Sequence, residues 1–201
     1  MWGTRPLSDT NPELVVLEAP NLCREYRVEN WHLSRDGSGK VIQGSNFLAW
    51  TDAVFVALAS LVWSWAKSHA AYFVCIVILF ALLIYLKCTQ VLWESVLVIP
   101  PHGIQLETHR GFPSYPLFAS RSFIPLTELQ DFVINEGLRG WDVRYYLAAL
   151  YKPSAGVLRV KVAYENILPH SPVLKEIYRG VHEYLQTSID ETKELHRYVK
   201  A

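Results

Sequence analysis

The sequence predicts an α+β protein anchored in a membrane, and three observations lead to this fold class. Two apolar runs, residues 47–66 and 70–86, follow one another with only three residues between them. Short strand-like segments separated by turn residues follow from Val91 onward, and an amphipathic segment begins at Ser171. We therefore expect a two-helix transmembrane hairpin followed by an antiparallel β domain with a C-terminal helix.

Each apolar run has the composition of a membrane-spanning helix. Residues 47–66 carry one charge, Asp52, and residues 70–86 carry none. About 20 residues at about 1.5 Å each match a hydrocarbon core of roughly 30 Å. Trp50, Trp63 and Trp65 stand near the ends of the first run, as in an aromatic belt. The alternative is a hairpin buried in a soluble core, but so small a domain can hardly cover two helices that are apolar all round.

Basic residues flank the two runs unevenly. Lys67 is the single basic residue of the turn apart from His69, whereas Lys87 follows the second run. The N-terminal flank holds Arg24, Arg27, Arg35 and Lys40. The positive-inside rule then predicts that both termini lie in the cytosol. We expect Asp52 to reach the headgroups, with a polar contact to a partner helix as the alternative.

Composition excludes several other classes of protein. Lys plus Arg equals Asp plus Glu at 19 each, so no bulk charge indicates nucleic-acid binding. The cysteines, Cys23, Cys75 and Cys88, are odd in number and lack metal-binding spacing. A disulfide framework or a metal site is therefore not expected.

Residues beyond Val91 have the pattern of short strands. Residues 95–99 and 104–108 flank a Pro-Pro-His-Gly turn, which predicts a β-hairpin, and residues 111–116 are expected to form a loop. Further strands are expected at residues 122–125, 131–135, 143–151 and 157–162. Apolar residues within 143–151 do not alternate strictly, so this strand is either buried on both faces or bulged.

A helix is expected to begin at Ser171-Pro172, which has a capping hydroxyl and then proline at the first helical position. Its apolar stripe is Leu174, Ile177, Tyr178, Val181, Tyr184 and Leu185. Strands capped by such a helix fit a pleckstrin-homology-like antiparallel β domain. The expected organisation is an N-terminal cytosolic segment at 1–46, helices at 47–66 and 70–86, the β domain at 91–188 and a charged tail at 189–201 that extends the helix or frays.

No catalytic, metal-binding or cofactor-binding constellation is evident in the sequence. It has no glycine-rich phosphate loop, no GxSxG and no HExxH. Three scattered histidines (His102, His109, His170) and three acids (Glu128, Asp131, Glu136) are best explained as surface residues. Basic residues that would bind phosphoinositide if they converged are Arg110, Arg121, Arg139, Arg144, Arg159 and Lys161. On residues alone, the chain is a membrane-anchored interaction module.

Residues 94–185 resemble the PIG-H family, a component of phosphatidylinositol N-acetylglucosaminyltransferase. The resemblance rests on motifs in the family's order after a two-helix hairpin: ESVLVI at 94–99, HGIQL at 102–106, FIPL at 123–126, DFVINE at 131–136, RYYL at 144–147 and LKEIY at 174–178. Residues before Phe47 match nothing in the family, and the 111–120 loop is individual to this chain.

The resemblance implies an accessory, non-catalytic subunit of the complex that transfers N-acetylglucosamine from UDP-GlcNAc to phosphatidylinositol, the first step of GPI-anchor biosynthesis. It places the chain in the endoplasmic reticulum membrane. It also implies that the chain binds and anchors a separate catalytic subunit, PIG-A, together with other subunits and membrane lipid, and that it needs no cofactor. Three alternatives stay open: a phosphoinositide-binding module, a membrane enzyme in its own right and a purely structural membrane protein.

The most family-like block is the expected contact with the catalytic subunit. It comprises Phe123, Ile124, Val133, Ile134, Asn135 and Glu136. The alternative is that its four apolar members belong to the core and that Asn135 and Glu136 alone matter, because a strand-end Asn-Glu pair has no packing role.

Overall fold

A computed structural model describes residues 2–4, 13–19, 22–33, 41–43, 70–112, 115–154 and 156–200, together with single residues between 53 and 63. The strands are β1 (Trp2–Thr4), β2 (Leu14–Ala19), β3 (Cys23–Glu29), β4 (Trp31–Leu33), β5 (Val41–Gln43), β6 (Val91–Ile99), β7 (Gly103–Phe112), β8 (Tyr115–Pro125), β9 (Leu129–Arg139), β10 (Asp142–Tyr151) and β11 (Arg159–Ala163). The helices are α2 (Ala70–Cys88) and α3 (Ser171–Lys200). The predicted α+β class is confirmed.

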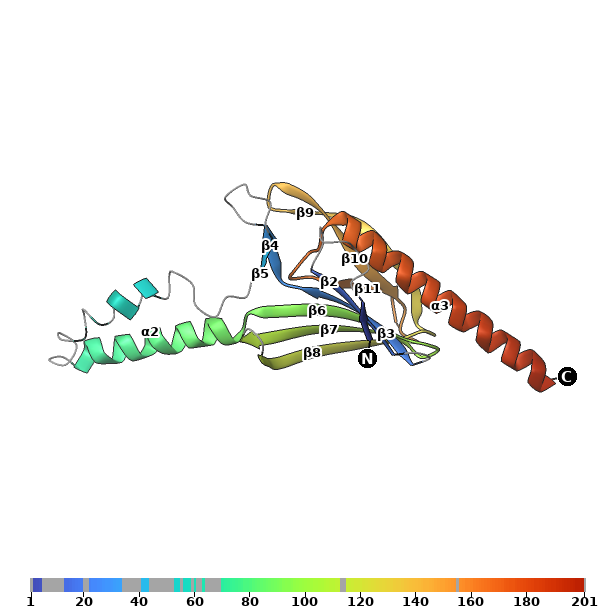
Figure 1. The fold of residues 1–201 in the computed structure, drawn as a ribbon, viewed down its shortest axis with the longest axis horizontal. Coiled ribbons are helices and arrows are strands. Elements are labelled where there is room, and N and C mark those ends of the chain that lie inside the picture. The colour runs from blue at the N-terminus through green and yellow to red at the C-terminus, as the bar shows by residue number, and fades with distance from the viewer. Residues whose placement is uncertain are drawn as a thin grey trace. The chain divides into compact units, whose positions relative to one another are not determined.

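The strands form three sheets. A six-stranded sheet has the order β1-β2-β3-β6-β7-β8, a three-stranded sheet has the order β11-β10-β9, and β4 pairs with β5 (Figure 1). The chain divides into two compact units. One comprises Met1–Asn30, Trp93–Thr108 and Ala119–Ala201, and holds most of the β structure with α3. The other comprises Trp31–Leu92 and His109–Phe118, and holds α2.

Every strand that the sequence predicts is present. The predicted hairpin of 95–99 and 104–108 is confirmed as neighbouring β6 and β7. The loop expected at 111–116 is shorter than predicted, since β7 continues to Phe112 and β8 begins at Tyr115. The irregular strand is also confirmed: β10 buries Leu147, Ala148 and Ala149 in succession, and its register with β9 shifts beside Leu150.

Three strands from the N-terminal segment, β1, β2 and β3, complete the larger sheet. β2 pairs with β3, and β3 pairs with β6 from Arg24 opposite Val98 to Glu29 opposite Trp93. Leu14 and Val28 are fully buried. The segment before the apolar runs, in which the sequence analysis finds no family motif, therefore supplies part of the same sheet as the family motifs.

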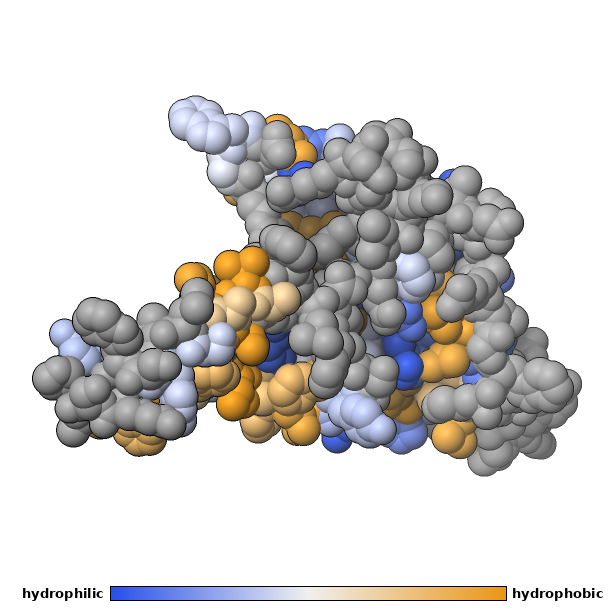
Figure 2. All heavy atoms as spheres, turned by 60° about the vertical axis from the view of Figure 1, so that its left-hand side comes forward, coloured by the Kyte–Doolittle hydropathy of each residue, from blue (hydrophilic) through white to orange (hydrophobic). Residues whose placement is uncertain are grey.

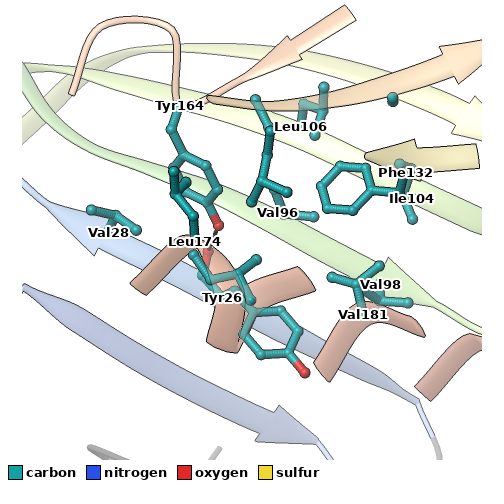
Figure 3. Packing of buried hydrophobic residues seen from close by; sticks show 14 of the residues in the cluster. Tyr26, Val28, Val96, Val98, Ile104, Leu106, Phe132, Tyr164, Leu174 and Val181 are labelled. Carbon is teal, nitrogen blue, oxygen red and sulfur yellow. Dashed lines mark hydrogen bonds between the residues drawn. The ribbon is translucent and has the colours of Figure 1, made fainter. Parts of the chain in front are cut away.

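One hydrophobic core joins the strands to α3. Figure 3 shows side chains of β3, β6, β7 and β9 meeting Leu174 and Val181 of α3. The core cluster comprises Leu14, Val16, Tyr26, Val28, Val96, Val98, Ile104, Leu106, Ile124, Phe132, Leu147, Ala149, Ala163, Tyr164, Val173, Leu174, Ile177, Val181 and Leu185. α3 contacts β9 and β10, and it continues through the predicted tail to Lys200.

The second predicted membrane span is present as α2. Within the described part of the chain, Ala71–Cys88 is the one helix long and apolar enough to cross a membrane, and none of it is buried inside the protein. Figure 2 shows hydrophobic side chains gathered on its surface. The first predicted span, residues 47–66, lies mostly outside the described residues. The described positions within it are helical, and Trp63 lies 6.0 Å from Phe73 of α2 between ring centroids.

A buried carboxylate organises the connection between β11 and α3. Glu94 of β6 is 2% exposed and accepts hydrogen bonds from Asn166 N (3.1 Å), Asn166 Nδ2 (2.7 Å), Ile167 N (3.0 Å) and Thr108 Oγ1 (3.1 Å). Next to this connection, the Tyr164 hydroxyl donates a 2.8 Å hydrogen bond to the backbone carbonyl of Tyr26 (Figure 3). Strands β6, β7 and β3 are thereby tied to the chain that enters α3.

A close approach fixes α3 against β3. A Cβ built on Gly180 would collide with the Tyr26 hydroxyl and would lie 2.7 Å from Tyr26 Cζ. Tyr26 is itself buried, and its hydroxyl is 3.5 Å from the Arg24 guanidinium. Only glycine therefore allows the helix this near to the tyrosine ring.

We expect Glu94→Gln to lower the free energy of unfolding by about 2–4 kcal/mol, because an amide cannot accept the same set of hydrogen bonds and points an N–H group at backbone donors. Chemical denaturation of the full chain in detergent would measure this. Glu165→Gln is the matched control, because Glu165 is exposed in the same connection, and its effect should stay within about 0.5 kcal/mol. Equal effects of the two substitutions would contradict the assigned role of Glu94.

We expect Gly180→Ala to destabilise the protein by about 1–3 kcal/mol through overpacking, although alanine favours helices over glycine by about 1 kcal/mol. Adding Tyr26→Phe should recover part of the loss, since it removes the nearest atom. A double-mutant cycle from denaturation midpoints would test the coupling. Strict additivity of the two substitutions would exclude it.

Candidate partner-docking surface

The structure separates the six predicted contact residues by burial. Ile124 is 2% exposed and belongs to the core, and Ile134 packs against it. Val133 is half-buried, whereas Asn135 and Glu136 are exposed. Phe123, from the same block, is also exposed. At least two of the apolar members, Ile124 and Ile134, thus have a packing role, whereas Phe123 does not belong to the core.

These residues also do not form one continuous face. Phe123 and Ile124 belong to β8 of the six-stranded sheet, and the other four belong to β9 of the three-stranded sheet. Successive residues of a strand point to opposite faces. Ile134 and Glu136 therefore share the face that continues the core, and Val133 and Asn135 share the other.

The β9–β10 hairpin extends beyond the core with its core-facing side still apolar. On that side, Phe132 pairs with Ala149 and Ile134 with Leu147, and these residues are buried or pack on the core. Further along, Glu136 pairs with Tyr145.

Leu138 then pairs with Val143, and Trp141 follows at the turn. Leu138 is 82% exposed, Trp141 is fully exposed, and Val143 and Tyr145 are also exposed. We call Leu138, Trp141, Val143 and Tyr145 the hairpin patch.

The hairpin patch has the chemistry of a protein-docking surface. Large apolar side chains gathered at one place on a surface indicate an interaction site, and tryptophan and tyrosine are enriched among the residues that dominate binding energy. The exposed charge of Glu136, which pairs with Tyr145, lies beside the apolar residues, as in the polar rim of an interface. The arrangement can bind a partner through apolar contact.

Sequence reasoning missed the four residues of the hairpin patch, although a signal was present. The hairpin turns at Gly140, whose φ of +66° suits glycine. Turn-flanking positions are usually polar, yet here Leu138 and Trp141 stand on either side. The pattern was missed because an apolar residue next to a turn is equally expected in a core strand.

The histidines and acidic residues that the sequence analysis considered as metal-binding or catalytic candidates do not form a metal site. No group of three or more His, Cys, Asp or Glu side chains that would hold a metal occurs among the described residues, so the three histidines do not form one. Asp131 instead faces His182 of α3, with 3.6 Å between Oδ1 and Nε2. Burial raises the pKa of the Cys23 thiol, with a smaller contribution from Glu25, which favours the unreactive protonated form.

Three of the candidate basic residues, Arg121, Arg144 and Lys161, lie on three different strands. Arg121 forms an ion pair with Glu107, with 3.2 Å between Nε and Oε1. Lys161 pairs in register with Ala149 on the core-continuing face of the three-stranded sheet, whereas Arg144 lies on the opposite face. Arg121, Lys161 and Arg144 therefore do not form one site for a phosphoinositide headgroup.

We expect Trp141→Ser to change the free energy of unfolding by less than about 0.5 kcal/mol because the side chain is exposed. Ile124→Ala and Ile134→Ala should each destabilise, Ile124→Ala by about 2–5 kcal/mol because it leaves a cavity. Denaturation of the three variants under one condition would test this division. A strong loss of stability in Trp141→Ser would show that the patch is covered within the chain itself.

Comparisons with known proteins agree with the sequence motifs. Residues 95–165 match the family model of the PIG-H component of the GPI-GlcNAc transferase complex, and the hairpin patch lies inside this segment. The chain is 33% identical over 86 residues to the gpi15 component of phosphatidylinositol N-acetylglucosaminyltransferase from Schizosaccharomyces pombe, which covers 43% of this chain and 50% of that one.

The H component of the same transferase from Homo sapiens is 31% identical over 110 residues, covering 53% of this chain and 56% of the human one. The Mus musculus H component is 26% identical over 166 residues, covering 81% of each chain. The chain thus aligns over about half the length of the first two relatives. No solved structure matches. The predicted resemblance to this family is confirmed.

Proposed function

We propose that this chain, similar to the PIG-H family across its central segment, is an accessory, non-catalytic subunit of the complex that transfers N-acetylglucosamine from UDP-GlcNAc to phosphatidylinositol. In this proposal it binds the catalytic subunit, PIG-A, and holds it at the endoplasmic reticulum membrane for the first step of GPI-anchor biosynthesis. The observation that carries the proposal is the hairpin patch, an exposed apolar surface within the family-like segment of a chain that also has a helix long and apolar enough to span a membrane.

The sheet pairing supports the two-helix hairpin. The chain leaves the larger sheet at Glu29 and returns to it at Trp93, which is the register partner of Glu29. A segment that starts and ends on neighbouring strands must cross a membrane an even number of times. α2 supplies one crossing, and residues 47–66 have the length and composition to supply the other.

The same argument supports the proposed topology. Strands from both sides of the apolar segment belong to one sheet, so β3 and β6 lie on one side of the membrane. The basic flanks favour the cytosol as that side. A cytosolic domain is also where an enzyme that uses a nucleotide sugar would be bound.

We further propose that the β structure is pleckstrin-homology-like. Support comes from the mostly sequential antiparallel order of β2, β3 and β6–β11 and from the C-terminal helix that packs on both sheets through one core. In this interpretation the membrane hairpin is an insertion between the second and third strands of the domain.

The proposed contact surface combines the hairpin patch with Asn135 and Glu136. Glu136 lies opposite Tyr145 at the edge of the patch, and Asn135 lies on the other face of the same strand. Phe123, on β8, is a separate exposed position. Anchoring an enzyme beside its lipid substrate raises their effective concentration without chemistry by the anchor, which suits a chain whose residues suggest no catalytic group.

Affinity purification of the tagged full chain from gently solubilised membranes tests the proposal. The unmodified chain should recover a transferase subunit and form N-acetylglucosaminyl-phosphatidylinositol in the eluate. Trp141→Ser with Val143→Ser should reduce recovery by about tenfold or more, since loss of an apolar anchor costs about 2 kcal/mol, and Asn135→Ala with Glu136→Ala should reduce it less.

Val157→Ser is the control, because Val157 is an exposed valine, like Val143, and lies outside the hairpin. Full recovery with the Trp141 and Val143 double variant would reject the hairpin patch as the contact. A chain recovered alone, under conditions that keep other complexes intact, would reject the accessory-subunit function itself.

A further inference from the structure

The first residues of β8 form a second exposed apolar group, distinct from the hairpin patch. Tyr115 is 73% exposed and Phe118 is 61% exposed, and Leu117 between them is also exposed. β8 is the last strand in the order of the larger sheet. Its outer edge therefore has no neighbouring strand among the described residues.

This group lies near the end of the membrane-spanning helix. α2 ends at Cys88, and the Gln90 carbonyl two residues later accepts a 2.9 Å hydrogen bond from Gly111 N. Gly111 in turn lies against the backbone of the next strand, because a Cβ built on it would be 2.6 Å from Leu117 N. Neighbouring strands lie about 4.8 Å apart, so the start of β8 is about 10 Å to the side of the helix exit.

The side chains of β8 change from apolar to polar along the strand and do not alternate between its two faces. Side chains of Leu117 and Phe118 point to opposite faces, as neighbours in a strand do, yet both are apolar and exposed. The residues that follow, Ala119, Ser120 and Arg121, are small or polar and are also exposed. A strand that covered a core with one face would alternate instead. This change is expected for a strand whose first residues contact an apolar medium on both faces.

The length of α2 places Tyr115, Leu117 and Phe118 at the level of the bilayer interface, so the apolar medium is the bilayer. The 19 residues of α2 span about 28 Å, close to the roughly 30 Å of a hydrocarbon core. Cys88 therefore lies near the boundary between lipid tails and headgroups. The interfacial layer beyond it is about 6 Å thick on each side, and it is the layer that tyrosine and other aromatic side chains prefer.

We propose that Tyr115, Leu117 and Phe118 insert into the interfacial layer of the bilayer beside the exit of α2. The start of β8 is thus a second membrane contact, and the ligand of this surface is the lipid surface itself. Two contacts, one by a spanning helix and one by a strand end, hold this part of the chain at a fixed tilt to the membrane. The inference depends on the membrane anchoring by α2 and not on any partner protein.

Depth measurements on the full chain alone in phosphatidylcholine nanodiscs test the proposal. Single cysteines for an environment-sensitive fluorophore are introduced as Leu117→Cys, Phe118→Cys and, as the control in the same strand, Ser120→Cys. Cys75→Ala and Cys88→Ala remove the accessible thiols, and Cys23 is retained because it is buried with a raised pKa. The labelled positions are exposed, so the fold is expected to tolerate them.

Fluorophores at positions 117 and 118 should show blue-shifted emission and stronger quenching by lipids that carry a nitroxide near the headgroup. Quenching should be at least about twofold weaker at position 120 than at position 117, because three residues of strand span roughly 10 Å. Water-like emission at all three positions would overturn the proposal, and so would equal quenching at all three, which means a strand lying flat. Because no catalytic subunit is present, either result is independent of the copurification outcome.

Discussion

The Glu94 carboxylate is the interaction on which the rest of this structure depends. It is almost completely buried in β6, and donors from β7 and from the connection after β11 satisfy it. A buried charge is tolerated only when it is hydrogen-bonded in this way. The same connection holds Tyr164 and Leu168 at positive φ values of 58° and 48°, which cost free energy in residues other than glycine. The hydrogen bonds to Glu94 offset that cost and hold the connection that leads into α3 against β6.

From that starting point, α3 closes the core that both sheets share. Val173, Leu174, Ile177 and Val181 are buried along its inner face, and the absence of a side chain on Gly180 lets the helix reach Tyr26 of β3. Removing Tyr164 from water raises its pKa well above the usual value, with a further contribution from the Glu94 charge. The neutral hydroxyl that binds the Tyr26 carbonyl is therefore favoured in the folded state below about pH 10, and its contribution is lost only as the pH rises beyond that.

Stability and interaction are carried by different parts of the same strands. On β9 and β10, Phe132, Leu147 and Ala149 belong to the core, whereas Leu138 and Val143 lie on the same side where the hairpin has passed beyond it. The sheet therefore holds these apolar side chains in place, and binding of the proposed partner would require little further ordering of them. The proposed membrane contact at the start of β8 belongs to a different sheet from the hairpin patch.

The sequence by itself determined the helix α2, the strands from β6 to β11, the start of α3 at Ser171 and the family resemblance. Each of these depends on local periodicity, on apolar length or on a motif that is continuous in the chain. Only the tertiary structure decided that β2 and β3 join β6 across the apolar insertion, and that Ile124 is core while Trp141 is surface. A run of apolar residues has the same pattern whether or not another element covers it, and that covering is settled by contacts between residues far apart in the chain.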